Sequence, residues 1–393
     1  MWLIAFACLT VVCAPVEGYL TELHAQLAKL PALLLVGTWA VVRLRQRRAP
    51  SAHPVHAVLL LLGSAVLASA AVHAGEPFTV EYAVRWLSFV AVAVVLVDVA
   101  SREVPPVALC AAAVGGAVAA GTGALHSLIA EEQSRAAGPL EDPNDLAYVL
   151  VTALPLLVAI VASRTGRGSV LLAGVAATVV LAGILATFSR GGMLALLAAT
   201  GWLTVRRVLP ARIFTGAVAL VAGLTLIAVT FVPGELARAT QEKAYIAQSN
   251  VDARELRWQA AARMLVENPL YGVGPGGFRS EYVAASDLAE LAEQLPVAHN
   301  IYLETGAELG IPGLVLLLGL AGTALVASER ALRRGADRRF VIAVQASLIA
   351  ALVASCFLSE QHYLPLWFAV ALACAIDLLS GRKCGNARPA RDQ

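Results

Sequence analysis

The chain has 393 residues, of which 59% are hydrophobic and only 14% are charged. A soluble globular protein carries about 25% charged residues, so this composition excludes that class and indicates a polytopic membrane protein. The formal net charge of +2 decides little, because the placement of Lys and Arg matters more than their sum in such a protein.

Motifs for nucleotide binding, serine hydrolysis and zinc catalysis are absent from the sequence, as is an Asp-x-Asp pair suited to a divalent cation on the outer side. None of the six cysteines belongs to a C-x-x-C pair, so the sequence indicates neither a disulfide nor a metal site. We therefore expect no cofactor, no metal and no nucleic-acid partner.

The apolar runs predict an all-α fold, a polytopic bundle of membrane helices with a large helical loop on the outer side. A membrane helix needs about 20 apolar residues, and about twelve runs approach that length. The first run lacks a charged n-region, so we interpret it as a membrane helix and not as a signal peptide. The expected spans are 2–16, 27–42, 55–74, 80–98, 104–124, 146–163, 169–188, 191–205, 212–232, 300–328, 340–358 and 364–380.

Basic residues set the expected orientation, because Lys and Arg near span ends resist translocation. They gather at alternate junctions, from the Arg43–Arg48 stretch to the Arg330–Arg339 stretch and the C-terminal tail. Both termini are then cytoplasmic. The expected organisation is nine membrane helices over 1–232, an outer loop over 233–299 that covers the site, three membrane helices over 300–380 and a cytoplasmic tail over 381–393.

Within the outer loop, residues 252–267 are expected to form a helix, with Asp252 as N-cap and Pro269 beyond its end. Arg254 and Arg257 lie three apart and so project from one face. That face is either solvated, as charged loop helices usually are, or a phosphate clamp, since guanidinium groups bind phosphate oxygens bidentately.

Arg190 lies between two apolar runs on the outer side. An Arg at membrane depth costs several kcal/mol unless it faces a cavity or a partner, so it indicates a substrate site. The flanking glycines would leave room for a ligand and favour this interpretation. The alternative is an Arg that extends to the membrane interface.

His299 lies where the chain enters an apolar run, beside Asn300, Tyr302 and Glu304. An imidazole titrates near neutrality and can take a proton from a hydroxyl nucleophile, so His299 is the candidate general base. A hydrogen-bonded interface His is the alternative, and the polar neighbours favour the catalytic role. Asn300 and Tyr302 are candidate substrate contacts.

Asp142 precedes Pro143, a pairing typical of a helix N-cap. That role is sufficient by itself, and substrate contact by Asp142, Asn144 or Asp145 is the alternative. For Glu308 the sequence leaves open whether it faces the bundle or water.

Five stretches together resemble the O-antigen ligase and polymerase superfamily, in the order of that family and over roughly residues 80–380. Each is weak alone, but the ordered set on a matching topology is specific. The stretches are Asp142-Pro-Asn-Asp-Leu-Ala147, Ser189-Arg-Gly-Gly192, Arg254-x-x-x-Trp258, Asn268-Pro-Leu-Tyr-Gly-Val-Gly-Pro-Gly-Gly-Phe278, and His299-Asn-x-Tyr-Leu303 followed by Glu308-Leu-Gly-Ile-Pro-Gly313.

The resemblance implies a GT-C-like glycosyltransferase of the bacterial inner membrane, with its active site facing the periplasm. Such enzymes pass a glycan from undecaprenyl diphosphate to an acceptor hydroxyl without metal. Arg190 and Arg254 would hold the diphosphate, with Arg257 ranked second, and His299 would act on the acceptor.

Three functions compete at this stage. The first is ligation to a glycolipid or glycan acceptor, lipid A-core being one candidate, and the second is polymerisation of lipid-linked repeat units by the same residues. The third is transport of a polysaccharide lipid. Transporters commonly show internal repeats and broken helices, which we do not find in the sequence. Catalysis by a soluble partner, with this chain as scaffold, is a further alternative.

Overall fold

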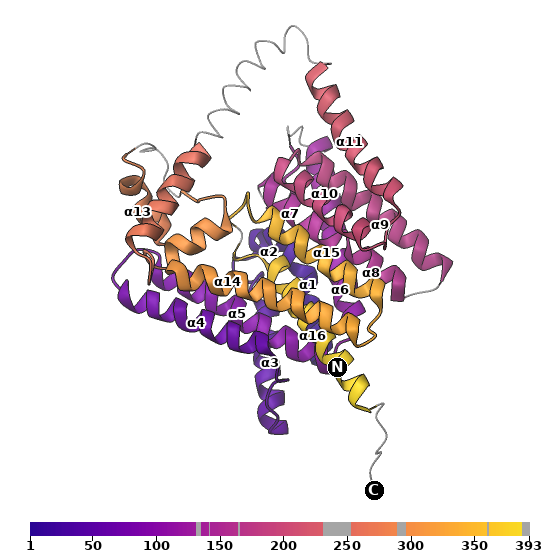
Figure 1. Ribbon diagram of the computed structural model, residues 1–393, viewed down its shortest axis with the longest axis horizontal. Helices are drawn as coiled ribbons and strands as arrows, with labels where there is room; N and C mark the ends of the chain where they lie inside the picture. Colours follow the sequence, from indigo (N-terminus) through magenta and orange to yellow (C-terminus); the bar gives the residue numbers. More distant parts are fainter. Residues whose placement is uncertain are drawn as a thin grey trace.

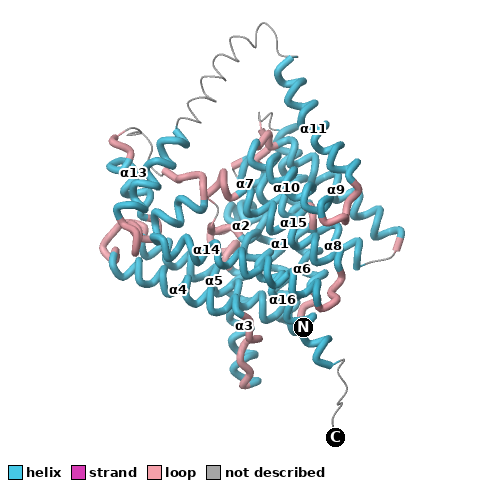
Figure 2. Tube along the Cα trace, viewed as in Figure 1, coloured by secondary structure: helices cyan, strands magenta, loops and turns pink. Residues whose placement is uncertain are grey.

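The computed structural model describes residues 1–130, 135–140, 142–163, 166–230, 253–288, 296–359 and 361–386. These ranges form helices, turns and loops, and they contain no strand (Figure 2). The prediction of an all-α fold is therefore confirmed for the described part of the chain.

The helices follow one another closely along the chain, mostly joined by short turns. Their bounds are α1 (Trp2–Cys13), η1 (Ala14–Val16), α2 (Glu17–Leu23), α3 (Leu30–Gln46), α4 (Pro54–Val72), α5 (Thr79–Arg102), α6 (Pro106–Ala130), η2 (Gly138–Leu140), α7 (Pro143–Ala153), α8 (Leu156–Ser163), α9 (Arg167–Ala186), α10 (Arg190–Val205), α11 (Ala211–Thr230), a helix over 253–267, α13 (Gly277–Ala285), α14 (Ile301–Arg333), α15 (Arg338–Ala354) and α16 (Leu364–Asn386).

Every expected span corresponds to a helix or to two consecutive helices, but not all of these meet the length of a membrane crossing. Among the described residues, eight helices are long and apolar enough to cross a membrane. By contrast, α3, α10 and α15 have 17, 16 and 17 residues. The count of about twelve spans thus remains a prediction, whereas a membrane protein with several crossing helices is supported.

The helices pack as one bundle, in which α14 lies against α4 and α16, and α15 lies against α7, α8 and α10 (Figure 1). Trp86, Tyr148 and Trp367 are fully buried and fill the spaces between helices. Elsewhere alanines line the contacts, as at Ala117 and Ala343, both 0% exposed. Small residues at such positions let helix backbones approach closely.

One helix is broken. Inside α14, Gly310 has φ 69° and ψ −170°, and Pro312 follows two residues later. Since a proline has no backbone N–H, the carbonyl of Glu308 loses its intrahelical donor. The N–H of Ile311 donates to the carbonyl of Pro269 instead, at 2.8 Å, so the carbonyl of Ala307 also needs a new partner.

The loop after the helix over 253–267 supplies both missing donors. The N–H of Val273 donates to the carbonyl of Ala307 at 2.8 Å, and the N–H of Gly274 donates to that of Glu308 at 3.1 Å. The backbones approach so closely that a Cβ on Gly272 would lie 2.3 Å from the carbonyl carbon of Glu308. Two stretches of the sequence, 268–278 and 308–313, therefore form one unit.

Arginines gather at the C-terminal ends of α10 and α14. Arg206, just past α10, pairs with Glu329 at 2.6 Å, and Arg334, just past α14, pairs with Asp377 at 2.6 Å. In the same region Arg382 donates to the carbonyl of Ser101 at 2.6 Å. These cations are the ones that set the expected orientation of the bundle.

We predict that Gly310→Ala destabilises the protein by about 2 kcal/mol or more, because a residue with a β-carbon is disfavoured in left-handed backbone and crowding adds to that cost. Its Cβ would lie 2.6 Å from the carbonyl oxygen of Pro269. Thermal unfolding of the detergent-purified protein measures the effect.

Gly322→Ala, in the same helix, is the matched control, since a Cβ there meets nothing within 4 Å. It should leave the unfolding temperature unchanged or raise it. Equal unfolding temperatures for both variants would contradict the role of Gly310.

Candidate active site

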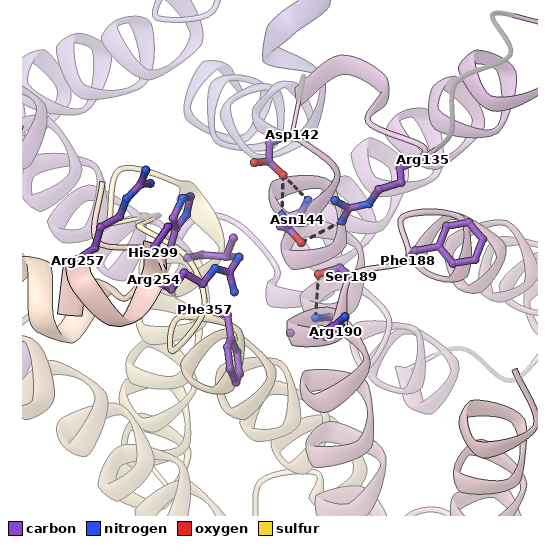
Figure 3. Close-up of a pocket in the computed structure, with 14 residues that line it drawn as sticks. Arg135, Asp142, Asn144, Phe188, Ser189, Arg190, Arg254, Arg257, His299 and Phe357 are labelled. Atoms are coloured by element: carbon purple, nitrogen blue, oxygen red, sulfur yellow. Dashed lines mark hydrogen bonds between the residues drawn. The ribbon is translucent and has the colours of Figure 1, made fainter. Parts of the chain in front are cut away.

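A cavity of about 500 Å³ lies at the end of the bundle where α7, α10 and α14 begin (Figure 3). Residues from distant parts of the sequence face each other across it, with Arg190 and Asn144 on one side and Arg254 and His299 on the other. The lining residues are Arg135, Asp142, Asn144, Phe188, Ser189, Arg190, Gly191, Gly192, Ala253, Arg254, Arg257, His299, Phe357 and Leu358.

The first turn of α10 forms part of one wall. Ser189 caps this helix by accepting a hydrogen bond from the N–H of Gly192 at 3.2 Å. The side chain of Arg190 follows directly and is exposed at the cavity. The sequence predicted a substrate site at Arg190, and in the structure the side chain of Arg190 lines the cavity.

The two glycines after Arg190 have a packing role besides the one expected. A Cβ on Gly191 would lie 3.0 Å from the Cβ of Phe357, and one on Gly192 would lie 2.7 Å from the Cβ of Ala147. Their absent side chains therefore let α10 begin against α7 and against the loop after α15. Both glycines also line the cavity.

The start of α7 forms the rest of this wall. Asp142 caps the helix by accepting from the N–H of Asn144 at 2.6 Å, with Pro143 at the first helical position. The expected N-cap is confirmed, and the same carboxylate also lines the cavity. Arg135 donates to the Asn144 amide oxygen at 3.2 Å and to the carbonyl of Thr187 at 2.9 Å, and so joins the starts of α7 and α10.

The opposite wall comes from the helix over 253–267, which the sequence predicted over 252–267; Asp252, its expected cap, lies outside the described residues. Arg254 and Arg257 both line the cavity, and their spacing of three residues places them on the same face of this helix. The Arg257 guanidinium carbon lies 6.0 Å from the ring centre of Tyr282.

Arg254 sits among other cations. Partial burial lowers the pKa of Arg254, and the nearby charges of Arg135, Arg190 and Arg257 act in the same direction, against the attraction of Asp142. Like charges held together in a half-buried space favour the binding of an anion.

His299 completes the cavity, one residue before the cap of α14. Burial lowers the pKa of His299, and the positive charges of Arg254 and Arg257 lower it further, against the opposing effect of Asp142 and Glu304. The imidazole is therefore neutral at pH 7 and has a ring nitrogen that can accept a proton.

Three residues that the sequence offered as candidate substrate contacts do not line the cavity. Asn300 caps α14 by accepting from the N–H groups of Tyr302 and Leu303 at 3.1 and 3.2 Å. The Tyr302 hydroxyl donates to the carbonyl of Leu352 at 2.7 Å. Asp145 is buried and accepts from the Tyr363 hydroxyl at 3.4 Å. Their polar groups are used within the bundle.

The question left open for Glu308 is also answered. Its side chain is 0% exposed and faces the bundle, where Arg279 approaches it at 3.3 Å. Arg135 and Phe357 also line the cavity and were not among the residues predicted from the sequence. Arg135 is a single cation outside any motif, and Phe357 is one apolar residue among many, so neither gives a signal.

The cavity as a whole favours a multiply charged anion. Four arginines line it, and Asp142 is the one carboxylate among the described lining residues. The N-termini of α7, α10 and α14 add the positive ends of three helix dipoles. Phosphate groups suit such a site, because guanidinium forks and backbone N–H groups are their usual partners.

Part of the chain is similar to a known protein family. Residues 175–318 match the family model described as O-antigen ligase. The matched region contains Arg190, Arg254, Arg257 and His299, whereas Asp142 precedes it. No curated protein matches the chain. The apolar helices indicate a membrane protein, and the family match points to polysaccharide biosynthesis and to a glycosyltransferase-like enzyme.

We predict that this cavity binds inorganic pyrophosphate, and that Arg254→Gln weakens this binding about 10- to 100-fold, because one charged hydrogen bond contributes about 1.5–3 kcal/mol. Calorimetric titration of the detergent-purified protein measures the dissociation constant. Arg45→Gln, at an exposed position of α3, is the control and should bind as the unmodified protein does. Equal binding by Arg254→Gln would exclude Arg254 from the anion site.

Proposed function

We propose that this protein transfers a glycan from a polyprenyl diphosphate, undecaprenyl diphosphate in bacteria, to an acceptor hydroxyl. One observation carries the proposal: four arginines and His299 line the same cavity. The arginines suit the diphosphate and the imidazole suits the proton of the acceptor. The family match over 175–318 supports a reaction of this class.

In the proposed reaction the acceptor oxygen attacks the anomeric carbon of the donor sugar while the bond to the diphosphate breaks. His299 takes the hydroxyl proton as the new bond forms. Arg190 and Arg254 stabilise the charge that grows on the leaving phosphate, and hydrogen bonds to a charged group in a water-poor site are strong. Arg135 and Arg257 add positive charge at the same cavity.

We expect this displacement to invert the anomeric centre. A retaining enzyme needs a carboxylate nucleophile close to the sugar. Asp142 is the one carboxylate among the described lining residues, and its Oδ1 is held at the start of α7. Glu304 and Glu308 are fully buried beside Arg279 and do not line the cavity.

The proposal includes an orientation in the inner membrane, with the cavity facing the periplasm and both termini in the cytoplasm. The arginines at the far ends of α10 and α14 support it, since basic span ends stay on the cytoplasmic side. A glycan donor would then reach the cavity from the outer leaflet.

Ligation to a terminal acceptor is our first choice, and polymerisation of lipid-linked repeat units is the alternative, because the same residues serve both. The test incubates the purified protein with an undecaprenyl-diphosphate glycan, first alone and then with a lipid A-core acceptor. Product that requires the acceptor indicates a ligase, whereas longer lipid-linked chains from donor alone indicate a polymerase. Movement of intact donor across a vesicle membrane without transfer would favour transport.

His299→Ala should retain donor binding and lower the transfer rate by about 100- to 10,000-fold, the usual contribution of a positioned general base. Donor binding and single-turnover transfer are measured separately. The control is His24→Ala, at an exposed position after α2, which should transfer normally. Near-normal transfer by His299→Ala would remove the general-base role.

The pH profile provides an independent check. His299 acts as a base only when unprotonated, so transfer should fall as the pH drops through its lowered pKa, and the acid limb of kcat/KM should lie below the ordinary value of about 6.5. The bound diphosphate neutralises the arginines and raises this pKa, so the acid limb of kcat should lie at higher pH than that of kcat/KM. Coincident limbs would argue against a diphosphate beside His299.

A further inference from the structure

We propose that Glu304 and Trp258 are positioning residues that hold His299 in its working conformation by clamping Ala298, one at its N–H and the other at its carbonyl. The inference rests on the proposed function, in which His299 takes the acceptor proton. Neither residue lines the cavity, so they would act through the backbone of the loop and not on the substrate.

The backbone of His299 requires such support. Its φ is 50°, in the left-handed region that residues with a β-carbon rarely adopt. A conformation of this kind persists only where the surroundings impose it, and it is typical of functional sites. The left-handed turn directs the imidazole to the cavity just before α14 begins at Ile301.

The preceding residue is held at both of its polar groups. The N–H of Ala298 donates to Glu304 Oε2 at 2.9 Å, and the carbonyl of Ala298 accepts from Trp258 Nε1 at 2.9 Å. Ala298 is 0% exposed. Because the two partners belong to different helices, Ala298, the residue before His299, is fixed from two directions.

The hydrogen-bond partners of Glu304 suit this task. Oε2 accepts from Ala298 and from the Ser359 hydroxyl, and Oε1 accepts from Gln361 at 2.9 Å and lies 3.4 Å from Arg279 Nη1. All four neighbours are donors. A carboxylate only accepts, whereas the NH₂ group of a glutamine would face two of these donors.

Arg279 stabilises the buried carboxylate. Its Nη1 contacts Glu304 and Glu308, both 0% exposed, and its guanidinium carbon lies 4.3 Å from the ring centre of Tyr82. Burial acts against the charge of Arg279, but the two glutamates outweigh this effect and raise its pKa. Glu304 is therefore a paired acceptor at a defined position and not an isolated charge.

Trp258 links the clamp to the arginines. It follows Arg254 by four residues, so the two side chains lie one turn apart on the same helix. The indole therefore fixes the helix over 253–267 relative to the peptide before His299. This hydrogen bond is therefore one of the contacts that set the distance between the phosphate-binding group and the base.

The test compares two substitutions that each remove one indole N–H and keep an aromatic ring. Trp258→Phe should lower kcat about 10- to 100-fold with little change in donor KM, because a base displaced by about 1 Å transfers protons poorly. Trp202→Phe is the control, since Trp202 lies on α10 and does not line the cavity. Its Nε1 also donates to a buried side chain, that of Gln345, at 3.3 Å. The control should change stability comparably and leave kcat unchanged.

A double-mutant cycle separates positioning from a general structural effect. In a His299→Ala background, Trp258→Phe should slow the residual transfer less than threefold, because the residue that it positions is gone. Glu304→Gln should behave in the same way if the clamp has two sides. The acid limb of the kcat/KM profile of Glu304→Gln should also move to higher pH, because His299 moves away from the arginines that lower the pKa of its imidazole.

The outcomes distinguish the two proposals. An unchanged kcat in Trp258→Phe and Glu304→Gln, with transfer lost in His299→Ala, overturns the clamp and retains the base. An equal loss from Trp258→Phe with and without His299 also overturns the clamp. Normal transfer by His299→Ala overturns the proposed function itself, and the clamp with it.

Discussion

The exchange of hydrogen bonds at the α14 kink is the constraint on which the site depends. Pro312 cannot donate to the carbonyl of Glu308, and in a bilayer an unsatisfied carbonyl costs several kcal/mol. The N–H of Gly274 donates to that carbonyl, and the N–H of Val273 donates to the carbonyl of Ala307, which the kink also leaves without its helical donor. The loop that follows the helix over 253–267 is therefore bound to the bundle by its backbone, and Arg254 is held above the starts of α7 and α10.

The glycines of that loop follow from the same constraint. Gly272 and Gly310 both have positive φ and lie against backbone atoms. A side chain at either position would push the loop away from α14. Backbone contacts of this kind leave the side chains of the neighbouring helices free for chemistry. The long cationic side chains that line the cavity are then not needed to hold the loop in place.

The sequence predicted most of the fold because a membrane helix must satisfy its backbone internally, which makes long apolar runs reliable. It also identified Arg190, Arg254 and His299 separately. It could not show that they share a cavity with Arg135, since that depends on tertiary packing. Likewise, a polar residue at a helix start gives the same local pattern whether it caps the helix, as Asn300 does, or faces a cavity.

The ring of arginines has a consequence for turnover under the proposed function. When the sugar leaves, the diphosphate keeps all of its charge and gains a free terminal phosphate, so the cavity holds the spent lipid carrier at least as firmly as the loaded one. The spent carrier then competes with new donor for the same arginines. Removal of this product by a phosphatase would set the pace of the enzyme.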